Sequence, residues 1–249
     1  MSAALRHDFS RRASPASLPE RMDAETDYET FRDTVASLAS VNRMTMGYRP
    51  QRVFLDRVLD ENLAAIAAAD QGLRVLDVGF GYGDTTRMLA RYLDRHWKGA
   101  EVVGVDLNPH AKRAAEAATP GYDGVTARYE TADVFEHVRA AAPYDLVFSA
   151  LFTHHLEDEQ VAAYLAWMDE TASVGWLIND LYRSKVAAAG FGALAALTGK
   201  HPHVRHDGPV SFARSFRRAD WRRLLDEAGV EGAEVAMLAP FRLCVAKHG

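Results

Sequence analysis

The short stretch Arg74–Asp84 constrains the fold of this chain more than any other part of the sequence. It opens with an apolar run typical of a buried parallel strand, made of Val75, Leu76 and Val78. Alternating glycines follow, which let the backbone take positive φ or approach a ligand closely: Gly79, Gly81 and Gly83. From Asp84 onward, apolar residues recur at helical spacing. We therefore predict a strand, a glycine turn and a helix whose N-terminus offers free N–H groups to a ligand.

A second apolar strand ends in an acid that narrows the choice of ligand. The segment Glu101–Asp106 has the pattern of a buried strand, and Asp106 lies 23 residues after Gly83. In nucleotide-binding α/β folds, an acid about 20 residues beyond the glycine turn binds ribose hydroxyls. A carboxylate at this place accepts hydrogen bonds from hydroxyls and repels a phosphate. We therefore predict a ligand with a free ribose.

The glycine spacing argues against two common nucleotide-binding motifs. Asp84 takes the place of the third glycine of the dinucleotide pattern G-x-G-x-x-G, and no Lys followed by Ser or Thr stands at P-loop spacing. The stretch Val75–Gly83 instead resembles motif I of the class I S-adenosylmethionine-dependent methyltransferases, hydrophobic-hydrophobic-Asp-hydrophobic-Gly-x-Gly-x-Gly. Asp77, the glycines and Asp106 together carry this resemblance. It implies S-adenosylmethionine as the cofactor.

The resemblance, which covers the chain from about Val75 to its end, also implies the fold. We expect an α/β protein with a doubly wound, Rossmann-like sheet of seven mostly parallel strands and an antiparallel last strand. The expected division is a flexible N-terminal tail over 1–22, an N-terminal helical lid over 23–70 and a methyltransferase domain over 71–249. A helical cap insertion is expected at about 183–212.

Hydrophobic periodicity places the other elements. Helices are predicted over Asp27–Leu38, from Pro50, from Asn108–Pro109, over Val186–Leu197 and over Arg218–Ala228. Strands are predicted over Val125–Glu130, Tyr144–Ser149, Val174–Asn179, Glu234–Leu238 and Phe241–Ala246. The apolar helix at 186–197 is expected either to cap the acceptor pocket or to bury its surface in a homodimer.

Composition excludes several classes of function. The chain has 249 residues, 48% of them hydrophobic and 25% charged, which is ordinary globular composition. A net charge of −5 argues against a nucleic-acid partner. The single Cys244 rules out an intrachain disulfide and suits a reducing cytoplasm. No apolar run reaches the length of a membrane span, and the first residues lack the apolar centre of a secretory signal. We predict a cytoplasmic protein.

The resemblance assigns a set of residues to the cofactor: Asp77, Gly79, Gly81, Gly83, Asp106, Leu107, Asp133, Val134, Ser149 and Arg43. It places Asp133 at the adenine amino group and Val134 on the ring, although Asp133 fits a helix N-cap equally well. It places Arg43 at the cofactor carboxylate and Tyr48 at the entrance to the site. Ordinary packing is the alternative for both of these residues.

Methyl transfer from a sulfonium is an in-line displacement, in which alignment of the reacting groups matters most. A base is needed only if the acceptor arrives protonated. Because histidine titrates near neutrality, His154 and His155 are the candidate catalytic residues, with His155 preferred. A His-His-Leu after the fourth strand is widespread in this superfamily, so a structural role for one of them is the alternative.

Further polar and aromatic side chains at the strand ends are expected to bind the acceptor: Tyr48, Phe152, Asp180, Arg183 and His206. A metal site was considered at His201, His203 and His206 with Asp207. Their spacing is irregular and a proline intervenes, so we predict no metal site.

The whole pattern resembles bacterial methyltransferases of secondary metabolism that act on small aromatic or polyketide-like acceptors. This resemblance favours O-methylation of a phenolic or quinol hydroxyl, with C- or N-methylation of a similar molecule as the alternative. A regulatory module that binds the cofactor without catalysis is a second alternative. An RNA or protein methyltransferase is disfavoured because Ser149–Phe152 lacks the Asn/Asp-Pro-Pro-Tyr/Phe motif. Asp84 disfavours an NAD-dependent oxidoreductase.

Overall fold

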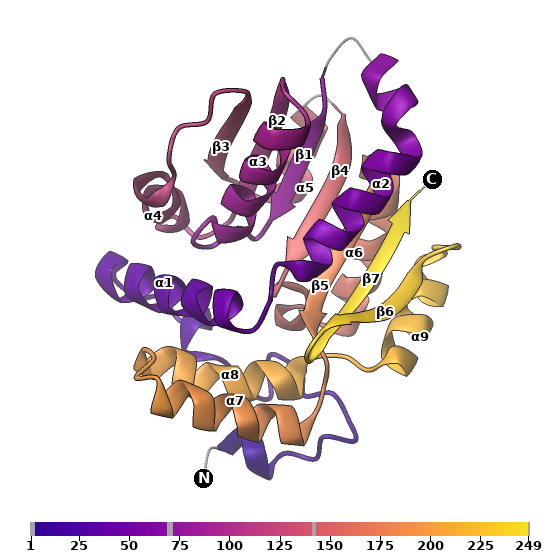
Figure 1. Ribbon diagram of the computed structural model, residues 1–249. Helices are drawn as coiled ribbons and strands as arrows, with labels where there is room; N and C mark the ends of the chain where they lie inside the picture. Colours follow the sequence, from indigo (N-terminus) through magenta and orange to yellow (C-terminus); the bar gives the residue numbers. More distant parts are fainter. Residues whose placement is uncertain (1–2, 69–71, 141–142, 249) are drawn as a thin grey trace.

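A seven-stranded sheet in the order β3-β2-β1-β4-β5-β7-β6 forms the centre of the molecule (Figure 1). This computed structural model describes residues 3–68, 72–140 and 143–248. The strands are β1 (Arg74–Val78), β2 (Ala100–Asp106), β3 (Val125–Thr131), β4 (Tyr144–Ala150), β5 (Ala172–Leu181), β6 (Glu234–Ala239) and β7 (Arg242–His248). Strand β7 runs antiparallel to both neighbours, and the other adjacent pairs are parallel. The predicted Rossmann-like sheet with an antiparallel last strand is confirmed.

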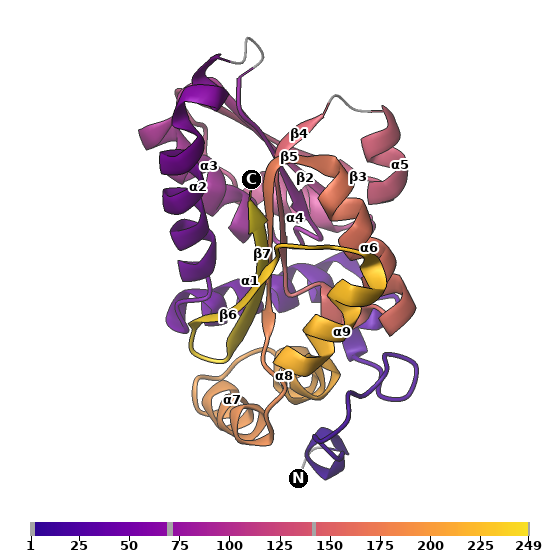
Figure 2. The same ribbon diagram turned by 90° about the vertical axis from the view of Figure 1, so that its right-hand side faces the viewer.

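Helices cover both faces of the sheet (Figure 2). One face carries α2 (Arg49–Ala68) and α3 (Asp84–His96), and the other carries α5 (Val134–Ala140), α6 (Asp158–Thr171) and α9 (Arg218–Ala228). Because side chains of a strand alternate between faces, Val75 packs in the layer with α2 and α3, and Leu76 packs in the layer with α6 and α9. Both faces of β1 are therefore buried, as its continuous apolar run predicted.

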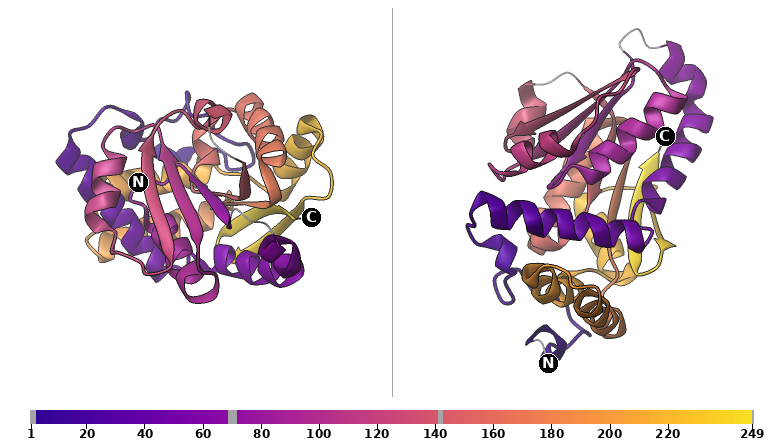
Figure 3. Two further views of the ribbon diagram at one scale, coloured as in Figure 1. Left: turned by 90° about the horizontal axis from the view of Figure 1, so that it is seen from above. Right: turned by 60° about the vertical axis from the view of Figure 1, so that its left-hand side comes forward.

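Three further helices lie below the carboxyl ends of the parallel strands (Figures 1 and 3). They are α1 (Tyr28–Met44), α7 (Lys185–Leu197) and α8 (Pro202–Arg214). The Asp27 side chain caps α1 by accepting the N–H of Thr30. Phe31 packs with Phe80 of the glycine turn and with α4 (Ala111–Ala118), so α1 covers the end of β1. Along the described residues, no helix is both long and apolar enough to cross a membrane.

Residues 3–22, expected as a flexible tail, are packed against the cap helices in the structure. Phe9 and Ala13 are buried beside α8, and the Ala13 N–H donates to the Ala213 carbonyl at 3.0 Å. Arg12 reaches the start of α6, where it pairs with Asp158 at 2.6 Å. The segment thereby brings side chains to the strand ends. The division of the chain into tail, lid and methyltransferase domain stays an interpretation of the sequence.

Several element boundaries differ from the prediction for local reasons. Helix α1 continues to Met44, so its last turn includes residues predicted to lie between helices. Helix α4 begins at Ala111 rather than at Asn108, because the Asn108 side chain accepts the N–H of His110 at 2.9 Å in a turn before the helix. Helix α8, with Pro209 inside it, lies largely in the expected helical cap insertion but was not predicted as a separate helix.

Candidate functional site

The glycine turn between β1 and α3 is packed at both ends and open in the middle. Gly83 has φ +70°, and a Cβ there would lie 2.8 Å from the Tyr129 ring. Gly79 also has φ +70°, and its Cβ would lie 2.9 Å from the Phe152 ring. At Gly81, with φ +53°, no atom of the described residues lies within 4 Å of the place of a Cβ. A ligand can therefore lie against the backbone at the centre of the turn.

Asp106 ends β2 beside this turn. Its carboxylate oxygens accept the backbone N–H groups of Gly81 and Asn108, each at 2.8 Å. Burial raises the pKa of Asp106 above its ordinary value, although the two hydrogen bonds oppose the rise. A carboxylate has about four acceptor positions, so Asp106 keeps capacity for hydroxyl groups. The open backbone at Gly81 and this acceptor capacity fit a cofactor with a free ribose.

Asp77 lies beneath the turn rather than on its open side. It is 1% exposed, and the Thr86 hydroxyl donates to it at 2.6 Å. Burial, with added repulsion from Asp84 and Asp106, raises the pKa of Asp77 to about 7. The structure thus places Asp77 as a buried link between the end of β1 and α3.

Two other residues assigned to the cofactor flank the turn. Leu107 follows Asp106 directly, and its side chain is 72% exposed. Ser149 pairs in register with Val78, the residue before the turn. The Ser149 hydroxyl is buried and has no hydrogen-bond partner in the part of the chain that the structure describes. An unpartnered buried hydroxyl at this position leaves a polar group available at the end of β4.

Asp133 has the N-cap role that the sequence allowed. Its Oδ1 accepts the N–H of Phe135 at 2.8 Å at the start of α5. Val134 is half-buried against the core, and Arg43 lies exposed in the last turn of α1. The assignment of these three residues to the cofactor stays a prediction.

Asp84 connects the junction of α1 and α2 to the glycine turn. It accepts hydrogen bonds from the Tyr48 hydroxyl at 2.6 Å and from the Asn42 amide at 3.2 Å. Arg242 donates to the other end of the Asn42 amide at 2.8 Å. Burial and the neighbouring Asp84 raise the pKa of Tyr48. Tyr48, predicted to bind the acceptor, therefore joins the α1–α2 junction to α3 in this structure.

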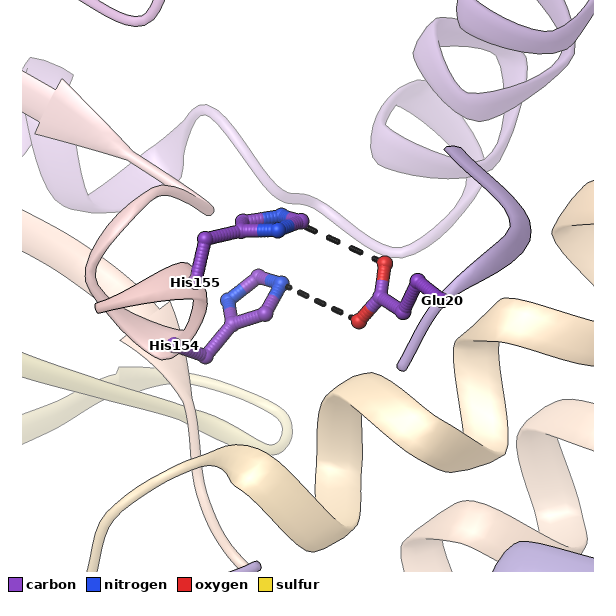
Figure 4. A group of neighbouring side chains, drawn as sticks. All are labelled: Glu20, His154 and His155. Carbon is purple, nitrogen blue, oxygen red and sulfur yellow. Dashed lines mark ion pairs between the residues drawn. The ribbon is translucent and has the colours of Figure 1, made fainter. Parts of the chain in front are cut away.

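The two histidines after β4 lie in a short 3-10 helix, η3 (Thr153–His155), and each has a carboxylate at Nδ1. His154 is 3% exposed, and its Nδ1 lies 2.8 Å from Oδ1 of Asp180. His155 is one-third exposed, with the side chain at 33%, and its Nδ1 lies 3.0 Å from Oδ1 of Asp23. Burial would raise the pKa of Asp180, but the facing His154 and the Thr153 hydroxyl bring it below its usual range. The Nε2 atoms of both histidines point instead toward the carboxylate of Glu20, and dashed lines mark these ion pairs in Figure 4.

Three residues that sequence reasoning missed complete this cluster. They are Glu20, Asp23 and Arg214. Burial raises the pKa of Glu20, which accepts a hydrogen bond from the Ser211 hydroxyl at 2.8 Å. Arg214 pairs with Asp23 at 2.7 Å. Burial would raise the pKa of Asp23, but hydrogen bonds from His155 and Arg214 keep it well below its usual range. The spacing of Glu20 and Asp23 matches a capping box, but that signal predicts only a local turn.

The remaining predicted acceptor residues lie outside this cluster. Phe152 rests on Gly79, as described above. Arg183 is buried and donates to the carbonyls of Phe9 and Ser215 and to Asp220. His206 pairs with Asp207 and lines a cavity of about 430 Å³ between α7, α8 and the N-terminal segment. Of the predicted catalytic and acceptor residues, the structure brings together His154, His155 and Asp180.

The sheet order, the glycine turn and the acid ending β2 define a class I methyltransferase fold. Residues 75–175 match a family model described as a methyltransferase domain. This part of the chain is therefore a methyltransferase domain, and its fold and glycine turn are consistent with S-adenosylmethionine as the cofactor.

Solved structures share the fold. Magnesium protoporphyrin IX methyltransferase from Synechocystis PCC 6803 with bound S-adenosylhomocysteine is 18% identical, with a TM-score of 0.50 over 90% of this chain and 88% of that one. The plantazolicin methyltransferase in complex with S-adenosylhomocysteine is 15% identical, with a TM-score of 0.55 over 88% and 91%. A putative O-methyltransferase from Nostoc punctiforme PCC 73102 is 16% identical, with a TM-score of 0.52 over 81% and 56%.

Proposed function

We propose that this enzyme methylates a phenolic or quinol hydroxyl of a small aromatic or polyketide-like acceptor, with His155 taking up the hydroxyl proton. When bound, S-adenosylmethionine supplies the methyl group: the acceptor oxygen bonds the methyl carbon as the carbon–sulfur bond breaks, and the sulfur leaves neutral. Such a displacement needs no acid at the leaving group. The chain's own residues need to align the acceptor and remove its proton.

The observation that carries this proposal is the geometry of His155. Its Nδ1 lies 3.0 Å from Asp23, a contact that favours the tautomer with the proton on Nδ1 and leaves Nε2 to accept another proton. The side chain is one-third exposed, which allows contact with an acceptor. His155 also follows β4, which lies next to β1 and its glycine turn in the sheet. His154, buried and held by Asp180, positions the loop instead.

The comparisons support a small-molecule acceptor. One similar structure is named for a magnesium porphyrin substrate, another for plantazolicin, and a third as an O-methyltransferase. Cytoplasmic location, a role in secondary metabolism and a homodimer stay predictions. A dimer interface on α7 would cover Val186 and Leu197, whose side chains are 79% and 86% exposed.

Cofactor binding is tested by calorimetric titration of S-adenosylmethionine and S-adenosylhomocysteine, with NAD as the control ligand. Asp106→Ala is expected to weaken the binding of S-adenosylmethionine and S-adenosylhomocysteine by about 100-fold or more. The variant loses both hydrogen bonds from the ribose hydroxyls to a charged carboxylate. Retained affinity in the variant, or tighter binding of NAD, contradicts the assignment of the cofactor to this turn.

The acceptor chemistry is tested by mass spectrometry with phenols, their methyl ethers and matched anilines. We expect a mass gain only for acceptors with a free hydroxyl. His155→Gln should slow methylation of a weakly acidic phenol by about 10²–10⁴-fold. It should slow methylation of a phenol that is already ionised at the assay pH far less, because that phenol needs no base. His96→Gln, an exposed histidine at the end of α3, is the matched control. An equal loss for both phenols contradicts the base role, and methylation at carbon or nitrogen contradicts O-methylation.

A further inference from the structure

We propose that Glu20, His154 and His155 form a binding site for a divalent metal ion of the zinc class. The Nε2 atom of His154 lies 3.7 Å from one Glu20 oxygen, and Nε2 of His155 lies 4.0 Å from the other (Figure 4). Ligand atoms of the three side chains all lie within 4.8 Å of one another. Two imidazoles and a carboxylate are a known zinc ligand set that leaves a fourth position open.

Both histidines turn Nε2 toward Glu20, while their Nδ1 atoms face other carboxylates. Nδ1 of His154 lies 2.8 Å from Asp180, and Nδ1 of His155 lies 3.0 Å from Asp23. A histidine that binds a metal ion through one ring nitrogen keeps its proton on the other, where a carboxylate commonly accepts it. The two outer carboxylates therefore suit a metal ion held by the two Nε2 atoms.

The distances fit a metal ion better than a proton. An N–H···O hydrogen bond spans about 2.7–3.2 Å, which is shorter than either separation between Nε2 and Glu20. Two zinc bonds of about 2.0–2.1 Å at a tetrahedral angle hold their ligand atoms about 3.4 Å apart, close to the observed 3.7 and 4.0 Å. The carboxylates on Nδ1 are also the partners that metal-bound histidines usually have, because they fix the ring and raise its basicity.

Charge in the cluster also suits a dication. Three carboxylates, Glu20, Asp23 and Asp180, are in contact with the histidines. Arg214 opposes them, with a nitrogen 3.6 Å from Glu20 and another 3.2 Å from Nδ1 of His155. However, Arg214 directs its short contact of 2.7 Å to Asp23, which matches its charge. Arg214 therefore leaves Glu20 with the weaker of its two ion pairs.

The site has both an anchor and an entry. The Ser211 hydroxyl holds the Glu20 carboxylate, and both Glu20 and His154 are buried. His155 is partly exposed and lies on the open side. An ion here would join the N-terminal segment to the loop after β4. It would also occupy the nitrogen that accepts the proton in the proposed reaction, so the metal-bound and base-competent states exclude each other.

The test is a calorimetric titration of zinc chloride into tag-free, chelator-treated protein, without cofactor or acceptor. We expect one ion per chain with micromolar affinity or better. Glu20→Gln and His155→Gln should each weaken binding by about 100-fold, and Asp23→Asn by about 10–100-fold. A variant with both His203→Gln and His206→Gln, outside the cluster, is the control and should bind as the wild type does.

Cobalt(II) provides a second measurement, because two imidazoles and a carboxylate in a low-coordinate site give visible absorption. His155→Gln should abolish that absorption while the circular dichroism stays unchanged. If Glu20→Gln fails to fold, wild type is compared with His155→Gln alone, because the His155 side chain is partly exposed and its replacement should not prevent folding. Absence of stoichiometric binding, or equal affinity in wild type and His155→Gln, overturns the metal site. Methyl transfer by the chelator-treated protein is assayed separately, so failure of the proposed reaction is distinguishable.

Discussion

The glycine turn, where we propose that the cofactor binds, and the histidine cluster, where we propose that the acceptor binds, are built in opposite ways; they are called the cofactor end and the acceptor end below. At the cofactor end, the contacts join residues close in sequence: Thr86 to Asp77 across 9 positions, and Gly81 to Asp106 across 25. At the acceptor end, His155 meets Asp23 across 132 positions and Arg214 meets Asp23 across 191. The first region is a local motif, whereas the second exists only after distant segments have packed.

The two ends also differ in how charge is held. Asp77 and Asp106 are acids in a polar turn whose pKa values are raised by burial. Asp23 and Asp180 are acids facing cationic or hydrogen-bonding partners, and their pKa values are lowered. Glu20, whose pKa is also raised by burial, is the exception among the acids beside the two histidines. This contrast can be tested region by region.

The largest expected effect is on the acceptor end. Arg214→Met removes the guanidinium that pairs with Asp23 and Glu20 in a buried cluster, and should lower the free energy of unfolding by about 3–5 kcal/mol. Arg223→Met is the control, because its pairs with Asp158 and Glu227 are exposed and each contributes less than about 1 kcal/mol. Urea unfolding measures both. Equal losses in the two variants would show that the distant cluster is no stronger than a surface pair.

The next effect is a pH dependence at the cofactor end. The pKa of Asp77 is about 7 in the folded protein and near 3.8 when unfolded, so the folded state holds the extra proton between these values. This contribution to stability is fully present below about pH 4 and is lost as the pH rises through 7, with a slope of about 1.4 kcal/mol per pH unit. Asp77→Asn should remove this part of the slope while keeping the hydrogen bond from Thr86. Parallel stability curves for wild type and variant from pH 4 to 8 would contradict the assignment.

A smaller effect separates the packed and open parts of the glycine turn. Gly83→Ala and Gly81→Ala each place a side chain at positive φ, which costs about 1–2 kcal/mol. Only Gly83→Ala adds a clash with Tyr129, so it should be the less stable variant. Gly81→Ala should fold but bind S-adenosylmethionine more weakly, because its methyl group enters the open side. The reverse order of stability would mean that the ends of the turn are not its packed parts.

The smallest effect concerns Asp133. Asp133→Ala should lower the free energy of unfolding by about 1 kcal/mol by removing the N-cap of α5, and Asp133→Ser should restore most of it. Thermal unfolding and cofactor titration of both variants separate the two roles. If the serine variant is stable and binds S-adenosylmethionine normally, Asp133 acts as a cap alone. Weakened binding in that variant would support the contact with adenine.

The sequence predicted the local motif at the cofactor end but not the contacts between distant segments at the acceptor end. The strand, glycine turn and Asp106 were recognisable because their pattern is contiguous, and α9 ends at Gly229 as predicted because a left-handed cap is a local requirement. Helix α8 was not predicted as a separate helix because Pro209 contradicts a helix unless tertiary packing overrides it. Glu20 was missed because nothing near it in sequence indicates its partners, Ser211 and the two histidines. Tyr48 was placed at the entrance, whereas its partner Asp84 was identified only as a break in the dinucleotide pattern.

The separation of 191 positions between Asp23 and Arg214 also sets an order of assembly during synthesis. Residues 3–23 leave the ribosome before the strands do, but Ser211 and Arg214 are added only after most of the sheet has been made. The strands from β1 to β4 can pair before Ser211 and Arg214, the partners of the N-terminal segment, have been synthesised. A nascent chain should therefore acquire the ability to bind its cofactor before it acquires a complete acceptor site.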